Sequence, residues 1–124
     1  MTTTSVDLRA RAEQLVEFIQ NGKIIEAMSE FYTDDVQMQE NSNPATIGQA
    51  ANIEREKQFL DNVAEWRGFT VKSLTVGDGV TAIENVIEFK AKDGSDVVME
   101  QIAVQRWRGD KIEHERFYYD ASSK

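Results

Sequence analysis

The sequence contains no cysteine and only one histidine, His114. Without cysteine the chain has no disulfide framework, no thiol nucleophile and no cysteine-type zinc site. A single histidine leaves only carboxylates as further metal ligands, and no paired ligand spacing such as HExxH is present. We therefore expect no metal site.

Basic residues are also scarce, because 14 Lys and Arg stand against 22 Asp and Glu and give a net charge of -8. Nucleic acids and anionic membranes need a basic footprint on a protein that binds them, so we expect neither as a partner. No hydrophobic run approaches membrane-spanning length, and the first residues lack the apolar segment of a signal peptide. The expected location is the cytoplasm.

The chain has 124 residues, of which 40% are hydrophobic. This length is typical of one domain, and a single core of this size buries roughly two-thirds of the surface of the unfolded chain. No repeat, low-complexity tract or linker divides the sequence. We expect a single domain over residues 1–124.

The first half of the chain is dominated by helical periodicity. Apolar residues recur at helical spacing over residues 6–20, 23–31 and 48–66, which predicts three helices. Between the second and third of these, residues 36–40 alternate and predict a short strand.

The second half alternates with a period of two and predicts four strands joined by hairpins, over residues 69–76, 80–91, 96–108 and 111–119. Helices grouped before such strands are typical of the α+β class. We expect three N-terminal helices packed on a curved mixed or antiparallel sheet. The whole would form a cone with a pocket at one end.

The first hairpin turn, at residues 92–95, decides which side chains share a face of the sheet. If its loop holds two residues, Glu84 lies opposite Ala103 and on the same face as Gln101 and Gln105. This face, defined by Gln101 and Gln105, is called the inner face below. The outer face would then be apolar and would carry Ile83, Ile87, Phe89, Val98, Ile102 and Val104.

The second turn, at residues 108–110, can be read in two ways. A two-residue loop brings His114 to the inner face. A three-residue loop with a bulge brings Glu115, Phe117 and Tyr119 to that face and turns His114 outward. A shift of the strand pairing by one residue moves every side chain of the last strand to the opposite face, and composition does not decide between the two readings.

The stretch FYTDDVQMQEN and the terminal pattern W-x-x-x-KI-x-x-ERFYYD, together with the order of elements, resemble SnoaL-like proteins of the nuclear transport factor 2-like superfamily. The resemblance covers nearly the whole chain and implies the cone-shaped α+β fold. It also implies that Glu115 and Phe117 point into the cone, which favours the three-residue loop and an outward His114. A homodimer through the outer face of the sheet is common in such proteins and is expected here.

Departures from the patterns of these relatives narrow the chemistry. The positions that hold oxyanion donors in ketosteroid isomerases are occupied here by Val16 and Ala103, so an enolate has no evident stabiliser. The Asp-Arg-Asp set of epoxide hydrolases corresponds to Val86, Glu84 and Phe117. SnoaL-type cyclases use a histidine and an aspartate inside the cavity, whereas the only histidine here is expected outside it.

Three glutamates are the candidate catalytic residues: Glu40, Glu84 and Glu115. Glu40 stands where the resemblance places the carboxylate base of ketosteroid isomerases. Carboxylates crowded in an apolar cone repel each other, so one should keep its proton near neutral pH and supply an acid beside a base. In the structural alternative, they lie at the mouth of the cone, solvated or paired with Arg55 or Arg67.

A further set of side chains is expected to bind a ligand: Tyr32, Met38, Phe59, Trp66, Gln101, Gln105, Phe117 and Tyr119. Aromatic residues could stack on a flat molecule, and the glutamines could orient a carbonyl or hydroxyl group. Alternatively, the aromatic residues are plain core and the glutamines satisfy the glutamates.

Three functions are compatible with these patterns. The first is a cyclase, isomerase or dehydratase that needs no cofactor and acts on a small hydrophobic, oxygenated molecule. The second is a non-catalytic protein that binds such a molecule. The third is a protein-interaction module that uses the outer face of the sheet.

Overall fold

The computed structural model describes residues 7–120, so the predicted start of the first helix at residue 6 lies outside the described range. The elements follow in the order α1 (Leu8–Gln20), α2 (Ile24–Phe31), β1 (Tyr32–Glu40), β2 (Thr46–Ile47), α3 (Gln49–Asp61), β3 (Val63–Val76), β4 (Val80–Ala91), β5 (Asp96–Arg108) and β6 (Lys111–Tyr118). None of the described helices is long and apolar enough to cross a membrane.

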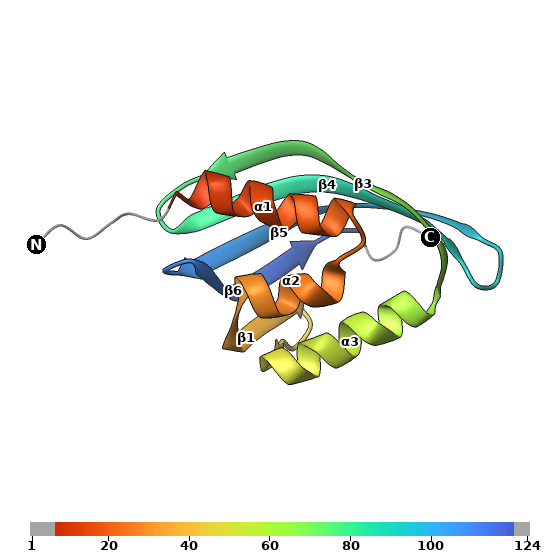
Figure 1. The fold of residues 1–124 in the computed structure, drawn as a ribbon, viewed down its shortest axis with the longest axis horizontal. Coiled ribbons are helices and arrows are strands. Elements are labelled where there is room, and N and C mark those ends of the chain that lie inside the picture. Colours follow the sequence, from red (N-terminus) through yellow and green to blue (C-terminus); the bar gives the residue numbers. More distant parts are fainter. Residues whose placement is uncertain (1–6, 121–124) are drawn as a thin grey trace, which may run out of the picture.

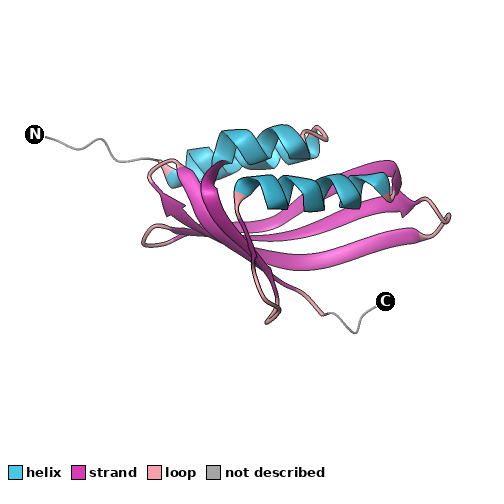
Figure 2. Ribbon diagram, turned by 90° about the horizontal axis from the view of Figure 1, so that it is seen from below, coloured by secondary structure: helices cyan, strands magenta, loops and turns pink. Residues whose placement is uncertain are grey.

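The strands form one six-stranded sheet in the order β2-β1-β6-β5-β4-β3. β1 and β6 are parallel, and the other neighbouring strands are antiparallel. The two ends of the sheet do not meet, and the three helices cover one face of it (Figures 1 and 2). The predicted α+β class, with helices on a curved mixed sheet, is confirmed.

The hydrophobic core lies between the helices and the inner face of the sheet. Leu15 of α1 and Phe31 of α2 are fully buried, and so is Ile112 of β6. The rings of Phe18 and Phe31 meet edge to face with their centroids 5.0 Å apart. Each large apolar side chain buried in this way stabilises the fold by roughly 1.5–3 kcal/mol.

The ends of α1 follow from its local sequence. The side chain of Asp7 accepts a hydrogen bond from the backbone N–H of Ala10 at 3.1 Å, which satisfies one of the free donors of the first turn. At the other end, Asn21-Gly22 stops the helix as predicted. Gly22 has a φ of 74°, a left-handed conformation that glycine adopts without strain.

The third helix is shorter than predicted. α3 ends at Asp61, whereas the sequence pattern predicts a helix as far as residue 66. β3 begins at Val63 instead, and Trp66 pairs with Phe89 of β4. Irregularities in the pairing of residues 63–68 allow positions at helical spacing to occupy a strand. Trp66 therefore extends from the sheet and not from a helix.

The β4–β5 hairpin corrects the predicted register. Its loop spans residues 92–94, since the Ala91 N–H donates to the Ser95 carbonyl at 2.9 Å and the last loop residue is a glycine with a φ of 90°. Glu84 consequently pairs with Ile102 and lies on the outer face. The outer-face prediction holds for Val98, Ile102 and Val104, but it is wrong for Ile83, Ile87 and Phe89, which face the helices.

The β5–β6 hairpin fits neither predicted reading completely. Its turn holds two residues, because Arg108 pairs with Lys111. An extra residue, Glu113, then lies in β6 opposite residues 106–107 and shifts the register by one. This bulge turns Glu115 inward and His114 outward, so the predicted orientation is right although the predicted loop length is wrong.

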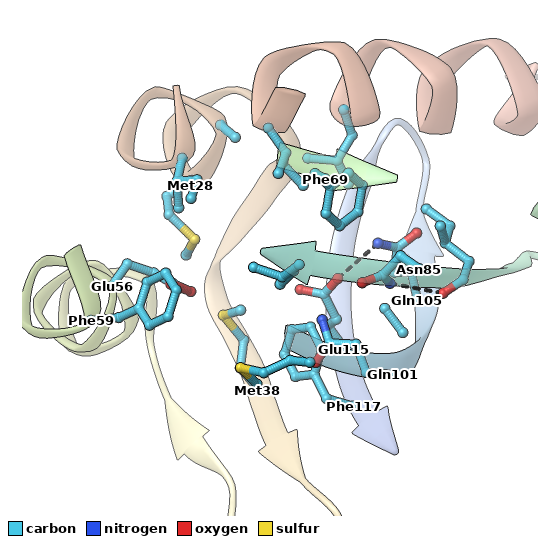
Figure 3. A pocket seen from close by; sticks show the side chains of 18 of the residues that line it. Met28, Met38, Glu56, Phe59, Phe69, Asn85, Gln101, Gln105, Glu115 and Phe117 are labelled. Atoms are coloured by element: carbon cyan, nitrogen blue, oxygen red, sulfur yellow. Dashed lines mark hydrogen bonds between the residues drawn. The ribbon is translucent and has the colours of Figure 1, made fainter. Parts of the chain in front are cut away.

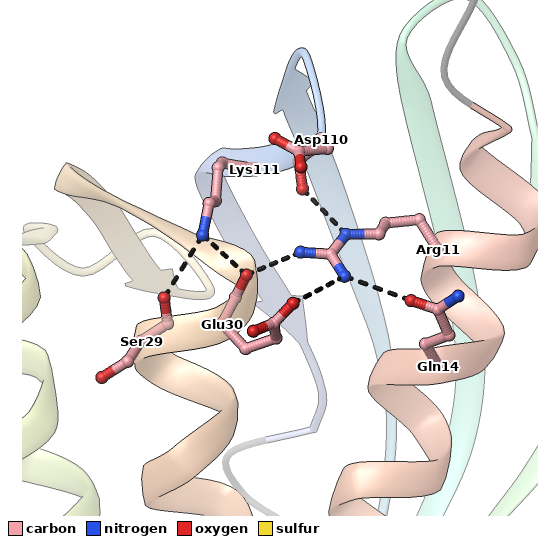
Figure 4. Close-up of polar contacts among 6 residues, drawn as sticks. All are labelled: Arg11, Gln14, Ser29, Glu30, Asp110 and Lys111. Carbon is pink, nitrogen blue, oxygen red and sulfur yellow. Dashed lines mark hydrogen bonds and ion pairs between the residues drawn. The ribbon is translucent and has the colours of Figure 1, made fainter.

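Arg11 of α1 joins the end of α2 to the β5–β6 turn (Figure 4). Its guanidinium donates to the Asp110 carbonyl at 3.0 Å and to the Glu30 carbonyl at 2.6 Å, and it lies 4.1 Å from the centroid of the Phe31 ring. Lys111 donates to the same Glu30 carbonyl at 2.8 Å. Two cations thus bind the C-terminal end of α2, where the helix dipole favours positive charge.

Candidate functional site

The helices and the inner face of the sheet enclose a cavity of about 170 Å³. Asn85, Gln105 and Glu115 lie on the sheet side of this cavity, and Glu56 and Phe59 of α3 lie across from them (Figure 3). Most of the lining is apolar, so the few polar groups in it determine what the cavity can bind.

The residues that line the cavity include most of those predicted from the sequence to form the site. All predicted ligand-binding residues line the cavity: Tyr32, Met38, Phe59, Trp66, Gln101, Gln105, Phe117 and Tyr119. Glu40 and Glu115 line it as well. Glu84 is exposed on the outer face, where its carboxylate accepts a hydrogen bond from Ser73 Oγ at 3.0 Å. The structure therefore removes Glu84 from the candidate site.

Glu115 is the most deeply buried carboxyl group of the cavity, with 3% of its surface exposed. Tyr32 Oη donates to Glu115 Oε1 at 2.6 Å, and Gln105 Nε2 donates to Glu115 Oε2 at 2.7 Å. Gln105 is held in turn, because its Oε1 accepts from Thr81 Oγ1 at 2.7 Å. Trp107 Nε1 donates to the same hydroxyl at 2.9 Å. This chain of hydrogen bonds fixes the direction of the Glu115 carboxyl group.

Burial raises the pKa of Glu115 from its usual 4.5 to about 7. The hydrogen bonds from Gln105 and Tyr32 oppose this effect, because they stabilise the charged form, while the negative charge of Glu56 adds to it. A carboxyl group that keeps its proton near neutral pH was predicted from the crowding of glutamates. In the structure the larger cause is desolvation, and repulsion between carboxylates is the smaller one.

Glu56 is a second carboxyl group of the cavity, and the sequence-based prediction missed it. Burial is the main cause that raises its pKa, and the charge of Glu40 raises it further, while Arg55 lowers it. Glu56 lies three residues before Phe59, which was predicted to face the ligand. That spacing puts both side chains on one side of α3 and is the signal that could have identified Glu56.

Glu40 lies in a polar group that lines the same cavity. Its carboxylate forms an ion pair with Arg55 Nη2 and accepts a hydrogen bond from Tyr119 Oη at 2.6 Å. About a third of each charged side chain remains exposed, 37% for Glu40 and 34% for Arg55. Pairing with Arg55 was the structural alternative to a catalytic role for this glutamate.

Two buried polar atoms of cavity residues have no hydrogen-bond partner among the described residues, Asn85 Oδ1 and Trp66 Nε1. The first is an acceptor and the second a donor. Asn85 was missed because the register predicted for the β4–β5 hairpin turned this residue outward. Trp66 was predicted as a stacking residue, but its free N–H could not be inferred from the sequence.

His114 lies on the outer face, as the resemblance implied. It pairs with Gln37 of β1 and with Arg106 of β5. Partial burial and the positive charges of Arg106 and Arg116 lower the pKa of His114, and Glu113 raises it by a smaller amount. The only histidine is therefore neutral at physiological pH and faces away from the cavity.

The substitutions His114→Gln and Glu84→Gln should leave ligand binding unchanged and alter the free energy of unfolding by no more than about 0.5 kcal/mol each. Both side chains lie on the outer face, and neither belongs to the hydrogen-bond chain that holds Glu115. Urea denaturation of the two variants measures the change. A loss of several kcal/mol for either variant would contradict the register described above.

Three helices lie against one face of an open mixed sheet, with a cavity between the two layers, and solved proteins described as nuclear transport factor 2-like share this α+β fold. Residues 12–115 match the model of the SnoaL-like domain family. The chain therefore belongs to the SnoaL-like domain family. A search of curated proteins found no matching sequence.

Solved structures share this fold. A protein from Mesorhizobium loti, assigned as a SnoaL-like polyketide cyclase, is 22% identical, with a TM-score of 0.80 over 92% of this chain and 100% of its own. A protein from Xanthomonas campestris pv. campestris, assigned as a polyketide cyclase, is 20% identical, with a TM-score of 0.76 over 92% and 90% of the two chains. A protein from Catenulispora acidiphila with a ketosteroid isomerase-like fold, solved with trimethylamine, is 15% identical, with a TM-score of 0.77 over 97% and 90%.

Proposed function

We propose that this protein binds a small hydrophobic, oxygenated molecule and catalyses proton transfer next to its carbonyl group without a cofactor. The observation that carries the proposal is Glu115, a buried carboxyl group in a mostly apolar cavity with a pKa of about 7. Such a group is present in both protonation states near neutral pH, so it can accept a proton and return it. Cyclisation, isomerisation and dehydration can all use this step.

In the proposed reaction the ionised Glu115 removes a proton from the carbon beside the carbonyl group. The protonated acid then returns the proton at another position of the same molecule. Tyr32 and Gln105 keep the carboxylate aimed at the substrate. The Nε1–H of Trp66, which has no partner within residues 7–120, would donate to the carbonyl oxygen, where negative charge develops.

Glu40 has a supporting role in this proposal, although the resemblance places it at the position of a catalytic base. Arg55 and Tyr119 both bind its carboxylate. Its side chain is also far less buried than that of Glu115, with 37% exposed. We assign Glu40, Arg55 and Tyr119 to positioning the substrate.

The proposal is tested with cyclohexanone, a single-ring ketone, by following exchange of its α-protons for deuterium in ²H₂O by ¹H NMR. The wild-type protein should accelerate exchange, and the rate should rise with pH up to about 7 and then level off, because only the ionised Glu115 acts as the base. Glu115→Gln should exchange at the rate of buffer, whereas Glu84→Gln should keep the wild-type rate. Acceleration that survives in Glu115→Gln, or none in the wild type, contradicts the proposal.

A second candidate is a non-catalytic protein that binds a small amine. The lining contains three carboxyl groups, those of Glu40, Glu56 and Glu115, and one guanidinium, that of Arg55. Aromatic rings and carboxylates together attract organic cations. The relative from Catenulispora acidiphila, which was solved with trimethylamine, gives this candidate support. It predicts no α-proton exchange in the experiment above.

The homodimer, the interaction module and the cytoplasmic location stay predictions. Val98, Ile102 and Tyr118 are exposed on the outer face, with 61%, 43% and 42% of their surface accessible, which is compatible with a second copy covering that face. The excess of acidic residues continues to argue against nucleic acid and anionic membranes as partners.

A further inference from the structure

Asn85 is a buried polar residue to which the proposed reaction assigns no role. Only 1% of its surface is exposed, and its side chain lies beside Gln105 and Glu115 on the sheet side of the cavity (Figure 3). Asn85 Nδ2 donates to the carbonyl of Ile83 at 3.0 Å. A carbonyl oxygen accepts only from the NH₂ side of an amide, so this contact fixes the orientation of the Asn85 side chain.

The remaining polar atom, Asn85 Oδ1, is therefore an acceptor that has no partner among the described residues. Leaving a buried acceptor unsatisfied costs about 1–3 kcal/mol, and native structures rarely leave one so. Two side-chain donors of the cavity lining are already engaged, because Gln105 Nε2 and Tyr32 Oη both donate to Glu115. Asn85 lines the cavity, but Oδ1 itself is shielded from water, so a molecule in the cavity brings a hydrogen-bond donor to this atom by displacing a side chain packed against it.

The size of the cavity limits that molecule. The volume of the cavity is about 170 Å³. An apolar cavity of about 150 Å³ in another protein binds benzene, so the cavity here has room for about one six-membered ring. A fused polycycle would have to extend through the open side of the cavity.

The charges around Asn85 limit the molecule further. Glu56 and Glu115 line the same cavity and disfavour an anion. We propose that Asn85 is a specificity-determining residue, and that the cavity selects a single-ring ligand whose uncharged hydroxyl group donates to Asn85 Oδ1. This inference rests on the proposed function for the identity of the cavity as the binding site, and it adds the class of ligand.

The test compares phenol with anisole, which has the same ring but a methyl group in place of the hydroxyl hydrogen. Each is titrated into ¹⁵N-labelled wild-type protein and followed by two-dimensional NMR. Phenol should bind about tenfold more tightly or better, since an unpaired buried acceptor disfavours anisole. The side-chain NH₂ signals of Asn85 should shift with phenol and not with anisole.

The matched variant is Asn85→Leu, which keeps the size of the side chain and removes the acceptor. It should lower the ratio of phenol to anisole affinity about tenfold, to near one. Glu84→Gln, on the next residue of β4 but on the outer face, serves as the control and should keep the wild-type ratio. If Asn85→Leu does not fold, the inference is tested by the affinities of the wild-type protein for phenol and anisole and by the shifts of the Asn85 side-chain NH₂ signals.

Equal affinity of the wild-type protein for the two probes overturns the inference, as does an unchanged ratio in a folded Asn85→Leu variant. Failure of both probes to bind overturns it as well. The proposed function is tested by a separate measurement, α-proton exchange, and is contradicted if exchange remains accelerated in Glu115→Gln. Selection of a hydroxyl group by Asn85 can therefore be refuted while catalysis by Glu115 stands, and the reverse is equally possible.

Discussion

As the pH rises from about 5 to about 8, the free energy of unfolding of Glu115→Gln should increase by about 2–3 kcal/mol relative to that of the wild type. Glutamine has nearly the same shape and keeps hydrogen-bonding groups opposite Tyr32 and Gln105. It removes the need to ionise a buried group. The variant should therefore lack the loss of stability that the wild type undergoes as Glu115 loses its proton.

The sign of this effect follows from the raised pKa. Glu115 binds its proton more tightly in the folded protein, where its pKa is about 7, than in the unfolded chain, where it is about 4.5. Its contribution to stability is fully present below about pH 4.5 and is lost as the pH rises through about 7. Carboxylates other than Glu56, whose charge acts on Glu115, affect both proteins equally, so the difference between them reports Glu115 and its interaction with Glu56.

Urea denaturation of the wild type and the variant across this pH range measures the difference in the free energy of unfolding. Glu84→Gln is the control, because it makes the same chemical change at an exposed carboxylate on the outer face, outside the cavity. A pH-independent difference for Glu115→Gln would mean that Glu115 ionises normally in the folded protein.

Arg11→Met should destabilise the protein by about 2–4 kcal/mol. Methionine retains much of the apolar contact with Phe31 but removes the charge. The Asp110 carbonyl and the Glu30 carboxylate then lose a charged donor at 3.0 Å and 3.1 Å, and only 13% of the arginine side chain is exposed to water. Helix α2 and the β5–β6 turn would lose the contact that joins them.

Arg9→Met is the matched control for this prediction. Arg9 is exposed on the same helix and donates a single hydrogen bond, to the Leu74 carbonyl at 3.1 Å. Its replacement should change the free energy of unfolding by no more than about 0.5 kcal/mol. Equal effects of the two substitutions in thermal or urea denaturation would show that the Arg11 contacts do not stabilise the fold.

Most of the fold could be predicted because the hydrophobic periods are long and clear. The first two helices and the three C-terminal strands end within a few residues of their predicted bounds where the structure describes them. The end of α3 was not predictable in the same way. Val63 and Trp66 are spaced as on a helix face, and only pairing with Ala91 and Phe89 across the sheet places them in a strand.

Register was the weak point of the prediction, because one residue in a turn reverses every side chain of a strand. A third loop residue in the β4–β5 hairpin moved Glu84 out of the site and brought Asn85 into it. In the β5–β6 hairpin, the turn has two residues and a bulge lies at Glu113, and together they turn Glu115 inward. The predicted three-residue loop would have turned Glu115 inward as well. The resemblance to known proteins settled that orientation, while the turn sequence could not.

The polar chemistry of the cavity depends on contacts that no sequence pattern contains. Glu115 keeps its proton near neutral pH because burial removes it from water, although the hydrogen bonds from Tyr32 and Gln105 favour its charged form. Glu56 and Asn85 enter the cavity from elements whose facing was ambiguous or wrongly assigned. Tertiary packing therefore decides which of the many polar and charged residues become part of the site.

The central claim is that Glu115 is a buried acid that titrates near neutral pH. Carbon-detected NMR of the protein with ¹³C-labelled glutamate carboxyl groups, assigned by comparison with Glu115→Gln, measures that titration directly. We expect a midpoint of about 7 for Glu115. A midpoint near the usual 4.5 would contradict it.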